Sequence, residues 1–240
     1  MADCARLEAG EPLAYLIGHT PFLDCTIHLD SRPLIPRPET EYWTELAIEA
    51  IKDLVRGETS NENLRGRTAK ILDLCAGSGA IGVAVAKAVP EAEVTFTEID
   101  PLHLPTITKN FALNTPVNRR IQLVESDLFA ELHTNHDTVL FDFILTNPPY
   151  IDAAANTVDN SVVAHEPHLA LFGGTAGMEI IARIILEAPT SLTATGQLWI
   201  EHEPAQVDAI TALAEKSGFT IVTHPDQYGT PRFSVLSMAQ

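Results

Sequence analysis

The segment Asp73-Leu74-Cys75-Ala76-Gly77-Ser78-Gly79 lies between a short apolar run at 71–74 and an apolar stretch with helical spacing at 79–88. A strand, a glycine-containing turn and a helix, in this order, form the place where an open α/β sheet binds nucleotide-like ligands. Gly77 and Gly79 allow the backbone to approach a ligand closely. Alone, the turn is a weak signal, because many strand-to-helix turns need glycine only for a left-handed or tightly packed backbone.

From about Lys70 onward the chain continues to alternate short apolar runs with helical patterns, which is typical of a parallel sheet covered by helices. We therefore predict an α/β fold with a Rossmann-like sheet. The predicted strands lie at 71–74, 94–97, 121–124, 143–146, 197–200, 220–223 and 233–237. The predicted helices of this part lie at 79–88, 103–113, 178–191 and 204–217.

The part of the chain before the sheet predicts a small attachment. Residues 22–29 resemble part of a hairpin, and Pro36-Arg37-Pro38 leads into a helix at about 39–55. Residues 57–68 are polar and contain Gly, Ser and Asn, as surface linkers do. We expect a hairpin-and-helix attachment at 1–60, the remnant of a substrate-recognition region, and a sheet domain at 61–240.

The charge balance restricts the expected partners. The chain of 240 residues carries 32 acidic and 15 basic residues, a net charge of −17. Nucleic-acid binders usually gain affinity by neutralising phosphates with Lys and Arg, so we expect no direct nucleic-acid ligand. Acidic surfaces also serve solubility alone. The longest apolar stretches, such as 80–86, are much shorter than the roughly 20 residues that cross a bilayer, so no membrane contact is expected.

The cysteines and histidines predict neither disulfides nor a metal. Cys4, Cys25 and Cys75 lie far apart, which favours reduced thiols in an intracellular compartment. The stretch His165-Glu166-Pro167-His168 superficially resembles a metal-binding helix. Its histidines are three residues apart instead of four, and proline disfavours a helix interior, so we expect no metal there.

Acidic residues after the next two strands favour a nucleoside ligand. Glu98 ends the second predicted strand, 19 residues beyond Gly79, where a carboxylate can accept hydrogen bonds from ribose hydroxyls. Asp100 is the alternative on the same face of the strand. After the third strand, Asp127 can accept from an adenine amino group, while Phe129 either lies against the ring or belongs to the core. A dinucleotide is less expected, because Cys75 occupies the first glycine position of a pyrophosphate-binding turn.

The fourth strand is followed by Asn147-Pro148-Pro149-Tyr150. Successive prolines fix φ and remove two backbone donors, so the side-chain oxygen of Asn147 and the carbonyl of Pro148 can each accept a hydrogen from a substrate NH₂ group. Tyr150 would form an apolar wall or stack on a planar group. Holding a delocalised nitrogen in line with a sulfonium methyl supplies part of the barrier by orientation. We therefore predict a methyltransferase that uses S-adenosylmethionine, with Asn147, Pro148 and Tyr150 as catalytic residues.

Four segments together resemble the release-factor glutamine methyltransferases of the HemK/PrmC type, over nearly the whole chain. Residues 11–18 look like the segment that leads into that family's hairpin, and residues 33–41 are very close to its "LIPRPETE" segment. The segment His165-Glu166-Pro167-His168-Leu169-Ala170-Leu171-Phe172-Gly173-Gly174 is similar to its "EPxxALfGG" stretch, and 198–206 to its "IExxxxQ" strand and helix. The NPPY motif is less specific, because amino-directed DNA and RNA methyltransferases share it.

The resemblance implies a class I methyltransferase fold and transfer of a methyl group to N5 of the glutamine in the GGQ motif of a peptide-chain release factor. Leu34, Asn147, Pro148, Pro149 and Tyr150 would surround the glutamine amide. Glu39 would lie, with Arg37 and Thr40, over the amino-acid end of the methyl donor. The complete predicted donor site is Arg37, Thr40, Asp73, Cys75, Ala76, Gly77, Gly79, Glu98, Ile99, Asp127, Leu128 and Asn147.

Two features depart from the family's pattern. Cys75 stands where the family usually has glycine, which predicts a less close backbone approach. Only residues 1–10 precede the hairpin segment here, whereas the family usually has a helical domain. Either that domain is missing from this sequence or partner recognition is reduced.

We expect a monomer. The compartment is predicted to be a bacterial cytoplasm or, with a slight preference from Trp43 and 231–233, a mitochondrion.

Two alternatives stay open from the sequence. A methyltransferase acting on N6 of adenine or another exocyclic amine of DNA or RNA could use the same NPPY chemistry, although the charge opposes it. A catalytically silent subunit that keeps the methyltransferase fold for binding is the second, and the intact Asn147 and Glu98 argue against it. A measurement of donor binding tests whether the protein is a silent subunit. Labelling of nucleic acid instead of a release factor would favour the DNA or RNA methyltransferase.

Overall fold

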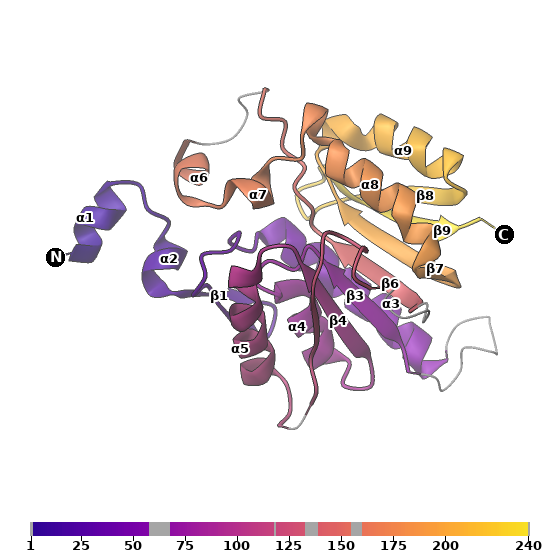
Figure 1. The fold of residues 1–240 in the computed structure, drawn as a ribbon, viewed down its shortest axis with the longest axis horizontal. Coiled ribbons are helices and arrows are strands. Elements are labelled where there is room, and N and C mark those ends of the chain that lie inside the picture. Colours follow the sequence, from indigo (N-terminus) through magenta and orange to yellow (C-terminus); the bar gives the residue numbers. More distant parts are fainter. Residues whose placement is uncertain (1, 58–67, 118, 133–138, 155–159, 240) are drawn as a thin grey trace.

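The computed structural model describes residues 2–57, 68–117, 119–132, 139–154 and 160–239 (Figure 1). The N-terminal part contains two short helices, a β-hairpin and one long helix, and the two chain ends lie at opposite ends of the long axis. Its elements are α1 (Ala2–Glu8), α2 (Leu13–Ile17), β1 (His19–Phe22), β2 (Cys25–His28) and α3 (Pro38–Arg56). Pro38 is the first residue of α3, and Gly57, with φ of 72°, ends it in the left-handed conformation.

The rest of the described chain forms a seven-stranded sheet with helices between the strands, so the predicted fold class is confirmed. The strands are β3 (Lys70–Leu74), β4 (Glu93–Glu98), β5 (Gln122–Glu125), β6 (Phe141–Thr146), β7 (Leu192–Glu201), β8 (Phe219–Pro225) and β9 (Pro231–Met238). The helices are α4 (Ala80–Ala88), α5 (Leu104–Asn114), α6 (Asn160–His165), α7 (His168–Leu171), α8 (Glu179–Glu187) and α9 (Val207–Lys216), with 3₁₀ turns η2 (Pro101–His103), η3 (Thr175–Gly177), η4 (Ala188–Thr190) and η5 (Pro204–Gln206).

The strand order is β5-β4-β3-β6-β7-β9-β8, and only β9 runs antiparallel to both of its neighbours. From β3 the chain proceeds outward to β4 and β5, and then returns to place β6 on the other side of β3. This reversal leaves a crevice at the carboxyl ends of β3 and β6, which is where such sheets bind ligands. Leu74 pairs with Thr146, so the glycine turn and Asn147 begin side by side.

Alternate residues of the central strands belong to two separate apolar clusters, one on each face of the sheet. Ile71 belongs to the cluster that includes side chains of α3, α4 and α5, and Leu72 to the cluster that includes side chains of α8 and α9. Successive side chains of a strand point to opposite faces, so both faces are buried. The predicted attachment therefore shares one apolar cluster with the sheet domain. The predicted boundary at 60/61 lies outside the described residues.

Asparagine side chains connect the hairpin to the sheet domain. Asn110 of α5 accepts from the backbone nitrogen of His28 at 2.8 Å and donates to its carbonyl at 3.0 Å. Asn114, one turn later, makes the same pair of contacts with Thr26 at 3.0 Å each. The two side-chain amides thus satisfy backbone groups on the edge of β2 that faces away from β1, as a neighbouring strand would.

The helix predicted at 178–191 is wrong as a single element, because α8 ends at Glu187 and the turn η4 follows. Pro189 lies in η4 and lacks the N–H that a further helical turn requires. The segment at 11–18 that leads into the hairpin contains helix α2, which was not predicted and which ends at Gly18 with φ of 85°. No helix among the described residues combines the length and the apolar character that a membrane span needs.

Candidate active site

The glycine turn after β3 takes up a left-handed backbone at three positions. The φ angles are 60° at Cys75, 55° at Gly77 and 78° at Gly79. Cys75 therefore adopts a backbone conformation that favours glycine, the residue that the resemblance led us to expect at this position. The backbone nitrogen of Ala76 donates to the carbonyl of Thr97 at 3.0 Å, which ties the turn to the end of β4.

Asp73 lies beneath this turn and stabilises the helix that follows it. The carboxylate is fully buried, and one oxygen accepts from the backbone nitrogen of Gly82 at 2.8 Å. The other oxygen has no hydrogen-bond partner among the described residues, and burial raises the pKa of Asp73 well above its ordinary value. Gly82 packs against the carboxylate and the Phe96 ring with no room for a side chain.

The first cavity of the site lies over the carboxyl ends of the four strands β3, β4, β5 and β6. Seven residues of the predicted donor site line it: Cys75, Gly77, Glu98, Ile99, Asp127, Leu128 and Asn147. Asp73, Ala76, Gly79, Arg37 and Thr40 do not line it. The lining residues that the prediction did not name as donor ligands include Thr97, His103, Ser126 and part of the segment at 167–172.

Glu98 is placed to accept hydrogen bonds at the floor of this first cavity. One carboxylate oxygen accepts from the backbone nitrogen of Gly77 at 2.7 Å and the other from that of Asp100 at 2.9 Å. Each oxygen can accept a further hydrogen, as ribose hydroxyls require. Thr97, the residue before Glu98, also lines this cavity, and its hydroxyl is buried without a partner among the described residues. With the apolar Ile99 and Leu128, these groups fit a nucleoside-bearing ligand.

Asp127 and Phe129 differ in their relation to this cavity. Asp127 lines it, is about half exposed, and pairs with Arg183 of α8 at 3.0 Å. Phe129 is buried in the apolar cluster under α8, so its ring packs in the core and does not line the cavity. Of these two residues, only Asp127 can therefore contact an adenine bound in the cavity.

A second cavity adjoins the first and is lined by four of the five predicted acceptor residues. Pro148, Tyr150 and Arg37 line the second cavity, and Pro149 lines the first. Leu34, Asn147 and Ala170 line both. Asn147 therefore lies at the junction of the two cavities, where a group bound in one meets a group bound in the other.

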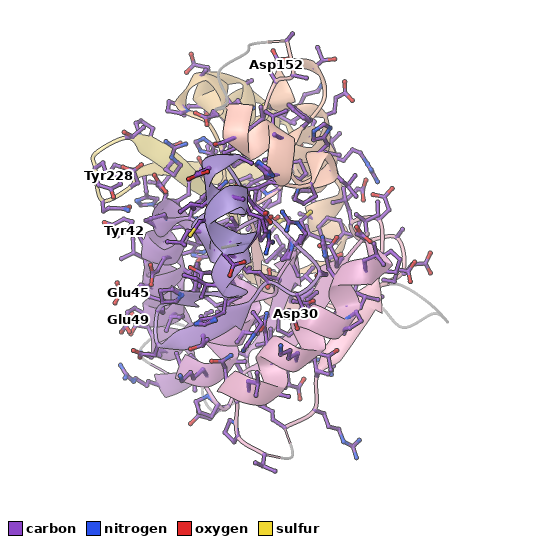
Figure 2. All side chains as sticks on the ribbon, turned by 90° about the vertical axis from the view of Figure 1, so that its left-hand side faces the viewer. Asp30, Tyr42, Glu45, Glu49, Asp152 and Tyr228 are labelled. Atoms are coloured by element: carbon purple, nitrogen blue, oxygen red, sulfur yellow. The ribbon has the colours of Figure 1, made fainter. Side chains whose placement is uncertain are left out.

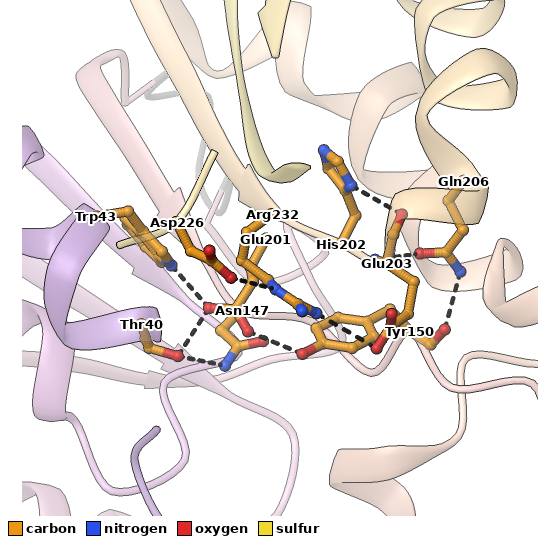
Figure 3. Close-up of polar contacts among 10 residues, drawn as sticks. All are labelled: Thr40, Trp43, Asn147, Tyr150, Glu201, His202, Glu203, Gln206, Asp226 and Arg232. Carbon is orange, nitrogen blue, oxygen red and sulfur yellow. Dashed lines mark hydrogen bonds and ion pairs between the residues drawn. The ribbon is translucent and has the colours of Figure 1, made fainter. Parts of the chain in front are cut away.

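Polar contacts hold the NPPY segment at this junction (Figure 3). The side-chain nitrogen of Asn147 lies 3.2 Å from the Thr40 hydroxyl, and the Tyr150 hydroxyl donates to Glu201 at 2.8 Å. Gln206 donates to the carbonyl of Tyr150 at 2.8 Å. Burial and the neighbouring carboxylate raise the pKa of Tyr150, so its hydroxyl keeps its proton and remains a donor.

Glu166 fixes the segment that carries Leu34 and Arg37. Its buried carboxylate accepts from the backbone nitrogen of Ile35 at 3.0 Å and pairs with Arg37 at 2.5 Å. Glu166 belongs to the stretch that superficially resembled a metal site, and its role in the structure is this contact. Among the described residues, no group of three or more His, Cys, Asp or Glu side chains is arranged to hold a metal ion.

Gly177 is required by the backbone of Tyr150. Gly177 has φ of 68°, and a Cβ there would collide with the Tyr150 carbonyl and lie 2.6 Å from the Gln206 side-chain nitrogen. We expect Gly177→Ala to lower the free energy of unfolding by at least about 2 kcal/mol more than Gly229→Ala does, measured by urea denaturation. Gly229 is the matched control, because its φ is 84° and nothing lies within 4 Å of its Cβ position. Equal losses of unfolding free energy in the two variants would mean that the left-handed backbone, and not the collision with Tyr150, causes the loss.

Known proteins resemble this chain in sequence and in fold. Residues 59–174 match the family model of the methyltransferase small domain. The protein-(glutamine-N5) methyltransferase, release factor-specific, of Alicyclobacillus acidocaldarius superposes with a TM-score of 0.50 at 21% identity over 88% of this chain and 97% of that one. The 16S rRNA N2 G1207 methyltransferase of T. thermophilus, solved with AdoMet and guanosine, gives a TM-score of 0.59 at 19% identity over 92% and 50%.

Fold and site thus define a methyltransferase with the class I sheet. The release factor glutamine methyltransferase of Rhodopirellula baltica is 38% identical over 214 residues, which are 89% of this chain and 68% of that protein. The chain belongs to the release factor glutamine methyltransferase family. The resemblance seen in the sequence is therefore confirmed, and the nucleic-acid and silent-subunit alternatives are not favoured.

Proposed function

We propose that this protein transfers a methyl group from S-adenosylmethionine to the side-chain amide nitrogen, N5, of the glutamine in the GGQ motif of a peptide-chain release factor. The position of Asn147 at the junction of the two cavities carries the proposal. The donor would occupy the first cavity and the glutamine the second. Family membership supports the same substrate, because the relative at 38% identity is a release factor glutamine methyltransferase.

The proposed donor site consists of the seven predicted residues that line the first cavity, with Glu98 accepting from the ribose hydroxyls and Asp127 from the adenine amino group. When bound, S-adenosylmethionine supplies an electrophilic methyl group on a sulfonium sulfur. Of the predicted donor residues, Asp73 and Gly79 would act by shaping the turn, because they do not line the cavity. The division into an attachment at 1–60 and a domain at 61–240 stays part of the proposal.

The protein's own contribution to the reaction is orientation and charge stabilisation. The oxygen of Asn147 and the carbonyl of Pro148 accept the two amide hydrogens, so the nitrogen faces the first cavity. As the new C–N bond forms and the C–S bond breaks, positive charge grows on nitrogen, and the two acceptors stabilise it. The nitrogen then releases one proton to solvent, which leaves a neutral N-methyl amide. Leu34 and Tyr150 enclose the planar group.

The acidic surface fits a protein substrate better than a free nucleic acid. Glu45 and Glu49 of α3 are exposed and point outward at the edge of the molecule (Figure 2). With a net charge of −17, the chain offers few cations for phosphates.

A monomer remains our prediction. The compartment also remains a prediction, and the relatives from Rhodopirellula baltica and Alicyclobacillus acidocaldarius are bacterial, so they give the mitochondrial preference no support.

The test is methylation of a purified release factor with isotopically labelled donor, followed by mass spectrometry of the peptide that contains GGQ. We expect one added methyl group on the glutamine and none on a factor with GGA in place of GGQ. Parallel reactions contain duplex DNA or ribosomal RNA. Labelling of nucleic acid with an unlabelled factor would support the exocyclic-amine alternative, and donor binding without any transfer would support the silent subunit.

A further inference from the structure

A buried carboxylate, Glu201, connects both ends of the NPPY segment (Figure 3). Glu201 ends β7, the strand beside β6, and is 1% exposed. One of its oxygens lies 2.7 Å from both the Trp43 indole nitrogen and the Thr40 hydroxyl, and the other accepts from the Tyr150 hydroxyl at 2.8 Å. Thr40, in turn, lies 3.2 Å from the side-chain nitrogen of Asn147.

The donors in this chain of hydrogen bonds fix its direction. An indole N–H can only donate, and a carboxylate can only accept, so Glu201 receives the Trp43 hydrogen. The single hydroxyl hydrogen of Thr40 points to the same carboxylate oxygen. The Thr40 oxygen is then left as an acceptor, and the group of Asn147 that faces it must be the NH₂.

This direction decides which end of the Asn147 side chain meets a substrate. In Figure 3 the nitrogen of Asn147 points to Thr40 and the oxygen points away from it. Among the described residues, no donor contacts this oxygen. A rotated side chain would present NH₂ to a substrate NH₂ group, and two donors repel each other. Thr40 itself is buried and lines neither cavity, so its contact is with Asn147 and not with a cavity ligand.

We infer that Thr40 and Glu201 are positioning residues, which hold the Asn147 side chain with its oxygen toward the acceptor nitrogen. This inference rests on the proposed function of Asn147. Neither residue touches a reacting atom; they act through Asn147. Glu201 also holds the Tyr150 hydroxyl, so one carboxylate sets the geometry at both ends of the four-residue segment.

The experiment compares Thr40→Val with Thr40→Ser. Valine keeps the shape of threonine but removes the hydroxyl, whereas serine keeps the hydroxyl. We expect Thr40→Val to lower kcat at least about 10-fold with the release factor as substrate, while the donor Kd, measured by calorimetry, changes less than about twofold. Thr40→Ser should recover most of the lost rate. Thr95→Val is the control for replacing a buried threonine, because Thr95 contacts Gln122 and lines neither cavity.

A second comparison separates positioning from general packing. Without the Asn147 side chain there is nothing for Thr40 to orient, so in an Asn147→Ala background the Thr40→Val change should reduce the residual rate less than about twofold. The same loss in both backgrounds would overturn the inference, as would a Thr40→Val rate equal to that of Thr95→Val or a serine variant as slow as valine. A wild-type protein that fails to methylate the factor overturns the proposed function first, and the inference with it.

Discussion

Replacing Asn147 by alanine is expected to lower the rate of methyl transfer at least about 100-fold, because the variant loses the acceptor that orients the amide and stabilises charge on its nitrogen. The donor should still bind with a Kd within about fivefold of the wild-type value, since Glu98 and the glycine turn are unchanged. The rate is measured in single turnover with labelled donor and release factor, and donor binding by calorimetry.

Asn114→Ala is the matched control for this change. Asn114 also uses its side-chain amide for hydrogen bonds, but to the backbone of Thr26 in the hairpin, and it lines neither cavity. We expect its transfer rate to stay within about twofold of the wild type. Equal rates for Asn147→Ala and the wild type would show that Asn147 does not hold the reacting group.

Glu201→Leu is expected to cost at least about 3 kcal/mol of unfolding free energy, because leucine leaves three donors without their acceptor. These donors belong to Thr40, Trp43 and Tyr150, and the Trp43 ring is fully buried. Each buried polar group without a partner costs about 1–3 kcal/mol. Urea denaturation monitored by tryptophan fluorescence measures the loss, provided that the slope with denaturant is unchanged.

Glu201→Gln is the isosteric comparison. Its side-chain oxygen can still accept from Trp43 and Thr40, and its NH₂ can donate to the Tyr150 oxygen, which a hydroxyl permits. We therefore expect a loss less than about one third of that in the leucine variant. If the leucine and glutamine variants lose the same unfolding free energy, the charge of Glu201 stabilises the protein and its hydrogen bonds do not. A leucine variant within about 1 kcal/mol of the wild type would contradict the assigned contacts.

The sequence predicted the sheet well because its strands are short apolar runs buried on both faces, a pattern with few alternatives. Elements without such a pattern were missed or misplaced. Helices α1, α2, α6 and α7 span at most seven residues each, too few for a helical period to be visible. The end of α8 was placed too late, because the apolar spacing continues past the point where Pro189 stops the helix.

The strand-end residues of the candidate site could also be predicted, since turns after parallel strands meet at one edge of the sheet. Asn147 and Glu98 both line the first cavity for this reason. The contacts that hold them could not be predicted, because they join distant parts of the chain. Thr40 and Glu201 are 161 positions apart, and Arg37 and Glu166 are 129 apart. The resemblance marked three of the segments involved, but it did not say which side chains touch.

The most direct test is a crystal structure of the protein with S-adenosylhomocysteine and a release-factor domain that contains the GGQ motif. We predict that the Asn147 oxygen lies within hydrogen-bonding distance of the glutamine side-chain nitrogen, that its own nitrogen still faces Thr40, and that the donor product contacts Glu98. A glutamine nitrogen bound elsewhere, or an Asn147 oxygen turned toward Thr40, would contradict the account.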